Sequence, residues 1–505
     1  MKTYGNLLDV PVFTATTTGE QKVKLTLPQL FSAYEKDAIE RLDYLRPDHE
    51  DAFHVFMACL GEMVLHNAEM ASGEGEDFWK TGLLALTQQQ TAPWTLFVED
   101  LGQAAFMQPP LTGFAAERLT RVEAAERIGA EALENIISSK NHDIKTDSVQ
   151  AIELEDWAYA LIAFQTRAPY LGSGKYSISR MNGGWGARVI CALRYDQTPG
   201  QRWQQDVARL QALRPGLTQA PAFYTNKGIG LVWVLPWDGE QSLSLTELSP
   251  FFIEIARAFR LHRTDEGHVL LRKSTSRSRR IDAEEFNGVI GDPWTPLKAG
   301  AEESWTPSSR FGVREIRDLI FGDGALLPAP MLSVLQNCKR PARFYCNTLI
   351  GGQGKNEGYI QSSLPIPQKV LPSLFRHTLV NDYLARLTKS AIESADRFYE
   401  KVLSATLSEI SKEVLLGDHF IKTAKEPFRA SWEDHLFEFA WQQAEMNDLD
   451  RSLRVWHEKL IHNGRNLLDT ACQTLPASRR YKVQAAVMRR YGYKVNKNFP
   501  LNTQD

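Results

Sequence analysis

The spacing of apolar residues changes character along the chain. Up to about residue 170 it is mainly helical, and residues 154–165 place apolar side chains at i, i+3, i+4 and i+7, which predicts one amphipathic helix. A short strand is predicted near residues 22–27. From residue 188 to about 360, short β-type runs at 189–193 and 229–235 alternate with segments broken by proline. Residues 249–261 predict a further helix, with Pro250 in its first turn.

Beyond about residue 374 almost the whole chain has helical periodicity. The pattern predicts helices at roughly 375–390, 391–415, 431–446, 449–470 and 476–491. Short breaks between long amphipathic helices favour an antiparallel bundle, most simply of four helices. We therefore expect an α+β protein, in which a large mixed N-terminal domain (1–370) precedes a C-terminal antiparallel four-helix bundle (371–505).

Composition narrows the class of protein. The chain has 505 residues, of which 43% are hydrophobic and 24% charged, as in soluble globular proteins. Its formal net charge of −3 means that any contact with nucleic acid must come from local basic patches. The sequence has no secretory signal and no apolar run long enough for a membrane span, and its five cysteines are scattered without a C-x-x-C pair. We therefore expect a cytoplasmic protein with buried, reduced thiols, no disulfide and no zinc site.

The segment 170–188 combines glycines with cations. Glycine lets a backbone approach another molecule closely, and Lys175, Arg180 and Arg188 suit an anionic target. The segment is not a Walker loop, because Pro169 stands where the first glycine belongs and a tyrosine stands where Mg²⁺ needs Ser or Thr. It also lacks the third glycine of a dinucleotide fingerprint. We interpret it as a glycine-rich basic loop without the means to hydrolyse a nucleotide.

Three further segments could carry function. Residues 272–280 hold five cations and no acid, a composition that suits phosphate contacts and is poorly suited to a core. The alternative is a flexible surface loop that binds nothing. Residues 351–358 contain four glycines, so a tight turn could present Lys355, Asn356 and Glu357 at its tip, or could be an ordinary hairpin turn.

The C-terminal tail is the third segment. Two interpretations of its cations stay open, a solvated helix face and a binding surface. The cations are Arg479, Arg480, Lys482, Arg489, Arg490, Lys494 and Lys497.

The sequence gives little support to an enzyme. His142 and Asp143 form an isolated pair that could bind a metal or act as a base, but a polar surface turn explains them better. There is no H-E-x-x-H metal motif, no G-x-S-x-G elbow, and no cysteine in an activating context.

Taken in order, several segments resemble the CasA family, the large subunit of the type I-E CRISPR surveillance complex Cascade. The resemblance covers most of the chain. The segments that carry it are 93–94, 103–108, 140–143, 172–184, 291–296, 351–358 and 395–399.

The resemblance implies a non-catalytic, DNA- and RNA-binding subunit of a ribonucleoprotein complex in antiviral defence. Members of the family recognise the protospacer-adjacent motif (PAM) in double-stranded DNA from the minor groove. They help to open the duplex for R-loop formation and provide a docking surface for a helicase-nuclease. The implied partners are therefore guide RNA, the other Cascade subunits, target DNA and that effector, with no membrane, cofactor or metal.

The resemblance also assigns roles to residues. It implies a glycine loop at Gly172, Ser173, Gly174 and Lys175, and a basic finger near Arg279 and Arg280. It implies a wedge at Lys355, Asn356, Glu357 and Gly358, and a loop near the guide RNA at Asn141, His142 and Asp143.

The chain departs from the family's pattern at two of these places. The wedge carries Glu357 where a well-known member has glutamine, and the finger is arginine where others have lysine. Two other functions stay open. One is a metal-dependent nucleic-acid-processing enzyme that uses His142 and Asp143, and the other is a scaffold that binds only proteins.

Overall fold

The computed structural model describes most of the chain in two compact units. The described residues are 3–121, 129–133, 153–168, 170, 172–181, 188–219, 223–334, 340–352, 355–375, 378–414 and 418–500. The first unit comprises Met1–Phe311, Leu326–Ser333 and Arg340–Pro365, and the second comprises Gly312–Ala325, Val334–Lys339 and Ile366–Asp505. These units are interleaved along the chain, so a single domain boundary near residue 370 stays a prediction.

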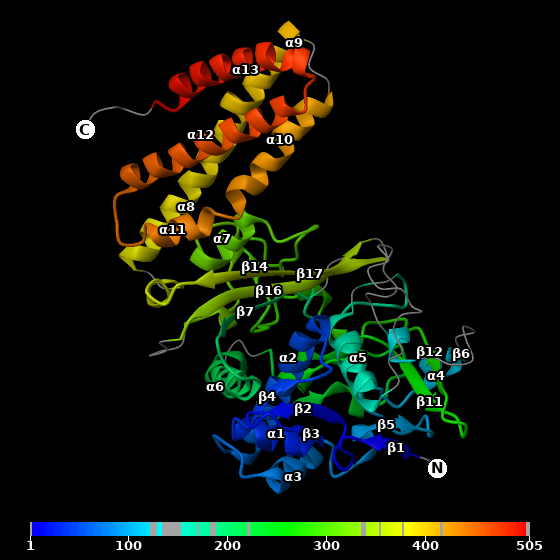
Figure 1. The fold of residues 1–505 in the computed structure, drawn as a ribbon. Coiled ribbons are helices and arrows are strands. Elements are labelled where there is room, and N and C mark those ends of the chain that lie inside the picture. Colours follow the sequence, from blue (N-terminus) through cyan, green and yellow to red (C-terminus); the bar gives the residue numbers. More distant parts are fainter. Residues whose placement is uncertain are drawn as a thin grey trace. The chain divides into compact units, whose positions relative to one another are not determined.

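The first unit mixes helices with small sheets (Figure 1). Its helices are α1 (Leu27–Glu35), α2 (Pro47–Ala68), α3 (Glu76–Leu86), α4 (Gly113–Glu117), α5 (Leu154–Arg167) and α6 (Pro199–Thr218). Its strands up to the middle of the chain are β1 (Thr3–Asn6), β2 (Phe13–Thr17), β3 (Lys22–Leu25), β4 (Ile39–Leu42), β5 (Thr95–Val98), β6 (Thr120–Arg121) and β7 (Ile190–Tyr195). Those that follow are β8 (Ile229–Leu231), β9 (Leu243–Ser244), β10 (Leu248–Ile253), β11 (Phe259–Arg263), β12 (Val269–Lys273), β13 (Ile281–Asp282), β14 (Leu297–Lys298), β15 (Leu326–Leu327), β16 (Ala342–Gly352) and β17 (Lys355–Ile366).

Helix α2 runs through the core of this unit. Nearly all its residues from His49 to Leu65 are buried, and a helix buried on all sides marks the middle of a core. Around it the strands form sheets of two or three, including β3-β2-β4, β11-β12-β6 and β17-β16-β7. The last two of these sheets place the segments of functional interest.

The sequence predicted several of these elements correctly and one wrongly. Helix α5 and strands β3 and β7 confirm the predictions for their segments. The helix predicted at 249–261 is wrong, because these residues form β10 and β11. Every residue of β10 is buried, and a short, fully buried apolar run has no periodicity that would distinguish strand from helix.

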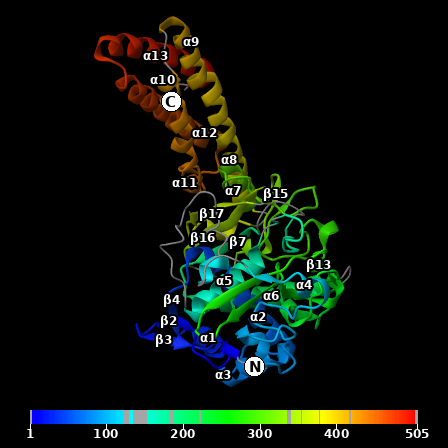
Figure 2. The ribbon, with the colours of Figure 1, turned by 90° about the vertical axis from the view of Figure 1, so that its right-hand side faces the viewer.

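The second unit is helical. It contains α7 (Val313–Phe321), α8 (Leu379–Phe398), a π-helical turn (Tyr399–Ser404), α9 (Ala405–Val414), α10 (Asp418–Glu433), α11 (Leu436–Gln442), α12 (Leu449–Gln473) and α13 (Ala477–Asn498). Figures 1 and 2 show α12 running beside α8, α10 and α13, and contacts between these pairs agree with both views. With the mixed first unit, this confirms the predicted α+β class.

Two details of the predicted helices are wrong. No break separates residues 390 and 391, because α8 continues through the π-helical turn into α9. Helix α10 was missed because Pro427, a residue that normally ends helices, lies inside it. Its neighbour Phe428 stacks on Phe398 with ring centroids 5.5 Å apart, so packing in the core holds the helix together across the proline.

Two further expectations concern cysteines and membranes. The four described cysteines, Cys59, Cys191, Cys346 and Cys472, are buried and free of disulfides, as predicted, and Cys338 lies outside the described residues. Within the described part of the chain, no helix combines the length and apolar character needed to cross a membrane.

Candidate nucleic-acid interface

The glycine loop (172–175) is a tight turn attached to the basic segment (272–280). Gly172 and Gly174 have φ angles of +113° and +75°, a region that favours glycine. The backbone N–H of Ser276 donates to the carbonyl of Gly174 over 3.3 Å. Two segments that are about 100 residues apart in sequence are therefore neighbours in space.

Side chains join the same two segments. The hydroxyl of Tyr176 donates to the carbonyl of Arg277 over 3.1 Å, and Arg279 Nη1 donates to Ser177 Oγ over 3.2 Å. The guanidinium of Arg257 donates to the carbonyl of Tyr176. These bonds make the loop and the segment a single structured surface, so the alternative of a flexible loop at 272–280 is wrong.

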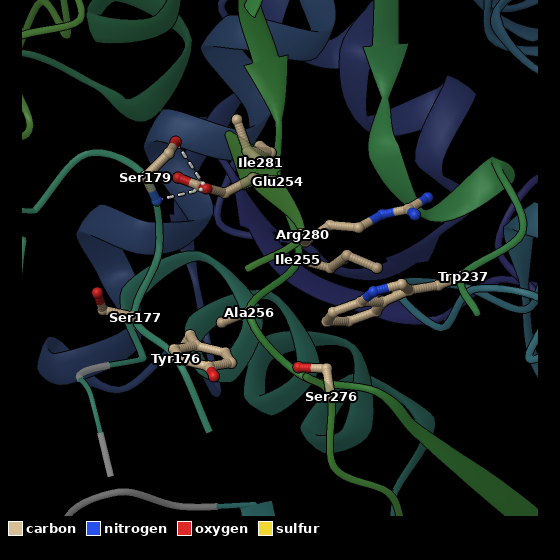
Figure 3. Close-up of a pocket in the computed structure, with 10 residues that line it drawn as sticks. All are labelled: Tyr176, Ser177, Ser179, Trp237, Glu254, Ile255, Ala256, Ser276, Arg280 and Ile281. Atoms are coloured by element: carbon tan, nitrogen blue, oxygen red, sulfur yellow. Dashed lines mark hydrogen bonds between the residues drawn. The ribbon is translucent and has the colours of Figure 1, made fainter. Parts of the chain in front are cut away.

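A small cavity lies between these elements (Figure 3). The centre of a water molecule can move in only about 10 Å³ of it, so it admits about one water and no substrate-sized molecule. The indole Nε1 of Trp237 is buried at this cavity and has no hydrogen-bond partner in the described part of the chain. The cavity lining is Tyr176, Ser177, Ser179, Trp237, Glu254, Ile255, Ala256, Ser276, Arg280 and Ile281.

Buried carboxylates anchor the chain that leaves the glycine loop. Glu254 accepts hydrogen bonds from both the backbone N–H and the hydroxyl of Ser179, each over 2.8 Å, as the dashed lines of Figure 3 show. It also accepts from Arg180 Nη1 over 2.8 Å. Further along, Arg188 forms two bonds of 2.7 and 2.8 Å to Asp292.

Arg180 and Arg188 therefore do not face an anionic target, and that prediction was wrong. Both are buried and paired with acids that lie far along the sequence, Glu254 and Asp292. Burial alone would lower the pKa of Arg180, but Glu254 and Asp292 outweigh it and hold that pKa above its usual range. The ion pair between Arg180 and Glu254 holds the chain that leaves the glycine loop in place.

The exposed positive charge comes from other residues. Lys175 in the glycine loop and Lys273 at the end of β12 are both exposed. Protein atoms around its ammonium lower the pKa of Lys273, and the charges of Lys175 and Arg257 lower it further. Burial of the ammonium is the larger cause of this shift, and the smaller part shows that Lys175 and Arg257 place like charge near Lys273. Sequence reasoning overlooked Arg257 because its segment had been interpreted as a helix.

The two candidate finger residues occupy different environments. The guanidinium of Arg280 is buried and donates to the carbonyls of Val232, Leu235 and Pro236 over 3.0 to 3.3 Å. Burial lowers its pKa to about 10. The side chain of Arg279 is 12% exposed and lies 3.3 Å from Glu284. That either residue contacts DNA stays a prediction, and the environment of Arg279 suits it better.

The candidate wedge lies where β16 and β17 meet. These strands are neighbours in the sheet β17-β16-β7 and join at residues 353–354, outside the described residues. Lys355, Asn356 and Glu357 belong to the start of β17, but their side chains are also outside the described part, and Gly358 has φ +138°.

The base of the hairpin is tied to the rest of the unit. Arg167 Nη2 donates to Asn347 Oδ1 over 2.6 Å, and Asn347 Nδ2 donates to the buried carboxylate of Asp51. The hydroxyl of Thr348 donates to the carbonyl of Arg188 over 3.2 Å. The hairpin and the chain that follows the glycine loop thus share one buried polar framework.

The candidate guide-RNA loop, Asn141, His142 and Asp143, lies outside the described residues. Within the described part, no group of three or more His, Cys, Asp or Glu could hold a metal ion.

Comparison with solved structures gives a consistent likeness over the full length. Thermobifida fusca Cse1 matches with a TM-score of 0.63 and 13% identity, over 99% of this chain and 98% of that chain. Thermus thermophilus CasA matches with a TM-score of 0.62 and 13% identity, over 98% and 100%. The chain has the CasA fold. A structure titled "CRISPR RNA-guided surveillance complex" also matches, with a TM-score of 0.61, 12% identity and 98% and 100% coverage.

Sequence comparison gives nothing comparable. No protein-family model and no curated protein matches the sequence. The CasA fold confirms the resemblance seen in the short motifs, at the level of fold.

Proposed function

We propose that this chain is the large, non-catalytic subunit of an RNA-guided DNA surveillance complex of the type I-E Cascade kind. The proposal is supported by the CasA fold over nearly the whole chain, including the match to a chain of an RNA-guided surveillance complex. Its partners are guide RNA, the other Cascade subunits and target DNA. Residues 1–370 carry the motif-recognition loops, and residues 371–505 form the helical domain.

Within that complex, the chain recognises a short duplex motif from the minor groove. The observation that carries this step is the bond between the glycine loop and the basic segment, because it joins a slender backbone turn to exposed lysines. The minor groove is narrow and presents a degenerate pattern of donors and acceptors, so a glycine backbone enters it more easily than a helix does. Lys175 and Lys273 then neutralise phosphates beside the groove.

The remaining roles follow from the same proposal. The tip of the β16–β17 hairpin acts as a wedge at the first base pair beyond the motif. Glu357 enters the duplex there because its shape fits, although the phosphates repel its carboxylate. The loop at Asn141, His142 and Asp143 lies near the guide RNA. A helicase-nuclease docks on the same subunit and cuts the DNA, and this chain itself performs no catalysis.

Target binding by the assembled complex tests the proposal. The complex with guide RNA should bind a duplex that carries the motif far more tightly than one with a scrambled motif. The double variant Lys175→Gln/Lys273→Gln should weaken that binding and reduce the slope of log K against log[salt] by about 1.8, at about 0.9 per phosphate contact. A matched control is Lys36→Gln/Lys227→Gln, which removes the same charge elsewhere in the first unit.

Three outcomes would count against the proposal. Equal loss in the control would show that the effect is general electrostatics. Failure of the chain to assemble with guide RNA and Cascade subunits would favour the protein-only scaffold. Cleavage of DNA by the purified chain with divalent metal, lost in His142→Ala, would favour the nuclease.

A further inference from the structure

Helix α13 has an unusual distribution of charge. Its 22 residues, Ala477–Asn498, contain no aspartate or glutamate and seven Lys or Arg residues. One side of the helix packs in the bundle, where Val483, Val487, Tyr491 and Val495 are buried. The cations must therefore lie on its flanks or on its outer face.

The structure places six of these seven cations in two groups, and the seventh, Arg479, is exposed and has an interaction partner of its own. Arg490 and Lys494 pair with Glu409 of α9, and Arg480 donates to the carbonyl of Leu475, so these three serve the bundle. The second group is exposed and forms no hydrogen bond or ion pair in the described part of the chain. Its members are Lys482, Arg489 and Lys497.

Two exposed tyrosines lie beside these cations: Tyr493 is on the same line of the helix as Arg489, and Tyr481 lies about 100° round the helix from Lys482. The side chains of Tyr481 and Tyr493 are 80% and 58% exposed. Lys482, Arg489 and Tyr493 follow each other at i, i+7 and i+11, which places them on one stripe about 16 Å long. We call Tyr481, Lys482, Arg489, Tyr493 and Lys497 the basic face of α13.

A solvated helix face does not explain this combination. Solvated faces usually mix both signs of charge, whereas this one carries cations only. They also rarely expose large aromatic rings, and Tyr481 and Tyr493 are among the few large hydrophobic side chains exposed in the part of the chain that the structure describes. A surface that offers isolated cations beside bare rings suits a partner with both negative charge and flat apolar surfaces.

We propose that the basic face of α13 binds single-stranded nucleic acid. The three cations contact backbone phosphates, and the two tyrosines stack on bases, which is how sequence-independent single-strand binders work. A duplex fits less well, because its bases are already stacked on each other and cannot accept a ring from a convex helix. An acidic protein surface would use the cations and leave the rings without a role. The inference concerns a face of the second unit and does not depend on the glycine loop.

Binding of oligo(dT), about 15 nucleotides long, to the full-length chain tests this proposal, with fluorescence anisotropy as the readout. The wild type should bind oligo(dT) more tightly than a duplex of the same length. The variant Lys482→Gln/Arg489→Gln should bind more weakly and reduce the salt slope by about 1.4, at about 0.7 per contact with a single strand. The variant Tyr481→Ala/Tyr493→Ala should lose about tenfold in affinity for each stacked base while keeping the wild-type salt slope.

A matched control separates this face from charge in general. Lys389→Gln/Lys401→Gln removes two exposed lysines from α8 and the following π-helical turn of the same bundle, and it should bind as the wild type does. Circular dichroism melting should show that all three variants fold.

Several results would overturn the proposal. One is oligo(dT) affinity that the charge and tyrosine variants leave unchanged. Another is a duplex whose binding the charge and tyrosine variants weaken as much as they weaken binding of the single strand. A third is competition by polyglutamate as effective as that by oligo(dT), which would assign the face to an acidic protein instead.

Discussion

Replacing Gly174 by valine should weaken binding of the DNA motif while the protein still folds. Gly174 has φ +75°, and a Cβ at this position would lie 3.0 Å from Thr275 Cβ and 3.2 Å from the carbonyl oxygen of Ser276. Both atoms belong to the basic segment, so the added side chain presses on the contact that we propose for motif recognition. The two methyl groups of valine extend further into the same space.

The size of the effect follows from two terms. A non-glycine residue at this φ costs about 1–3 kcal/mol. Displacing the basic segment also weakens the bond from Ser276 N–H to the Gly174 carbonyl, which contributes about 1 kcal/mol. Together they disfavour the observed loop conformation by about 2–4 kcal/mol. The population of that conformation should therefore fall by about 30-fold or more.

The assay is binding of motif-bearing duplex by the assembled complex, with circular dichroism melting as the folding control. Gly172→Ala is a matched comparison, because Gly172 also has positive φ (+113°) but no neighbour within 4 Å of an added Cβ. It should suffer the backbone strain alone and lose less binding than Gly174→Val. Gly216→Ala, in a helix with open space around it, should change nothing. Unimpaired binding by Gly174→Val in a folded protein would refute the role of this loop.

Three other predictions concern the residues around the loop and a buried histidine. Arg280→Met should lower the free energy of unfolding by about 3 kcal/mol or more, because it leaves buried carbonyls without a donor. Arg279→Gln should lower it by less, about 1 kcal/mol, because it removes the bonds to Ser177 and Glu284, and should weaken motif binding. Glu254→Gln should cost about 3–5 kcal/mol in urea unfolding, because Arg180 would lose its closer buried anionic partner and keep only Asp292, 3.8 Å away. Burial and a nearby arginine lower the pKa of His54 in the folded state, so the unfolded state binds more protons below about pH 6.5 and stability falls as the pH drops. His54→Gln should flatten the fall in urea midpoint between about pH 7.5 and 5.5, and an unchanged slope would contradict this assignment.

Much of the fold follows from local pattern. Helix α5 could be predicted because its apolar residues fall on one face, and the helical second unit because its long amphipathic helices are separated by short breaks. The failures occur where tertiary packing outweighs local preference. Strand β10 is buried on both sides and shows no alternation, and α10 continues through Pro427 because aromatic stacking in the core supports it.

The candidate site was only partly predictable. Sequence identified the glycine loop and the basic segment but could not show that they touch, because the bond from Ser276 to Gly174 joins residues about 100 positions apart. Sequence analysis also assigned one role to the cations of segment 170–188, because they lie close together in the sequence. The structure separates Lys175, which is exposed, from Arg180 and Arg188, whose acidic partners lie far along the chain.

This separation agrees with the anion-binding surface that we propose for this weakly acidic chain. Buried ion pairs contribute little net stability, because desolvation offsets their attraction. Their value here is geometric, since Glu254 binds Ser179 and Arg180 at once and so fixes the direction in which the chain leaves the glycine loop. A loop that is already held in place loses little entropy when it meets a groove, and more of its contact energy appears as affinity. The acids that lower the net charge of the chain are thus part of what prepares its exposed cations for binding.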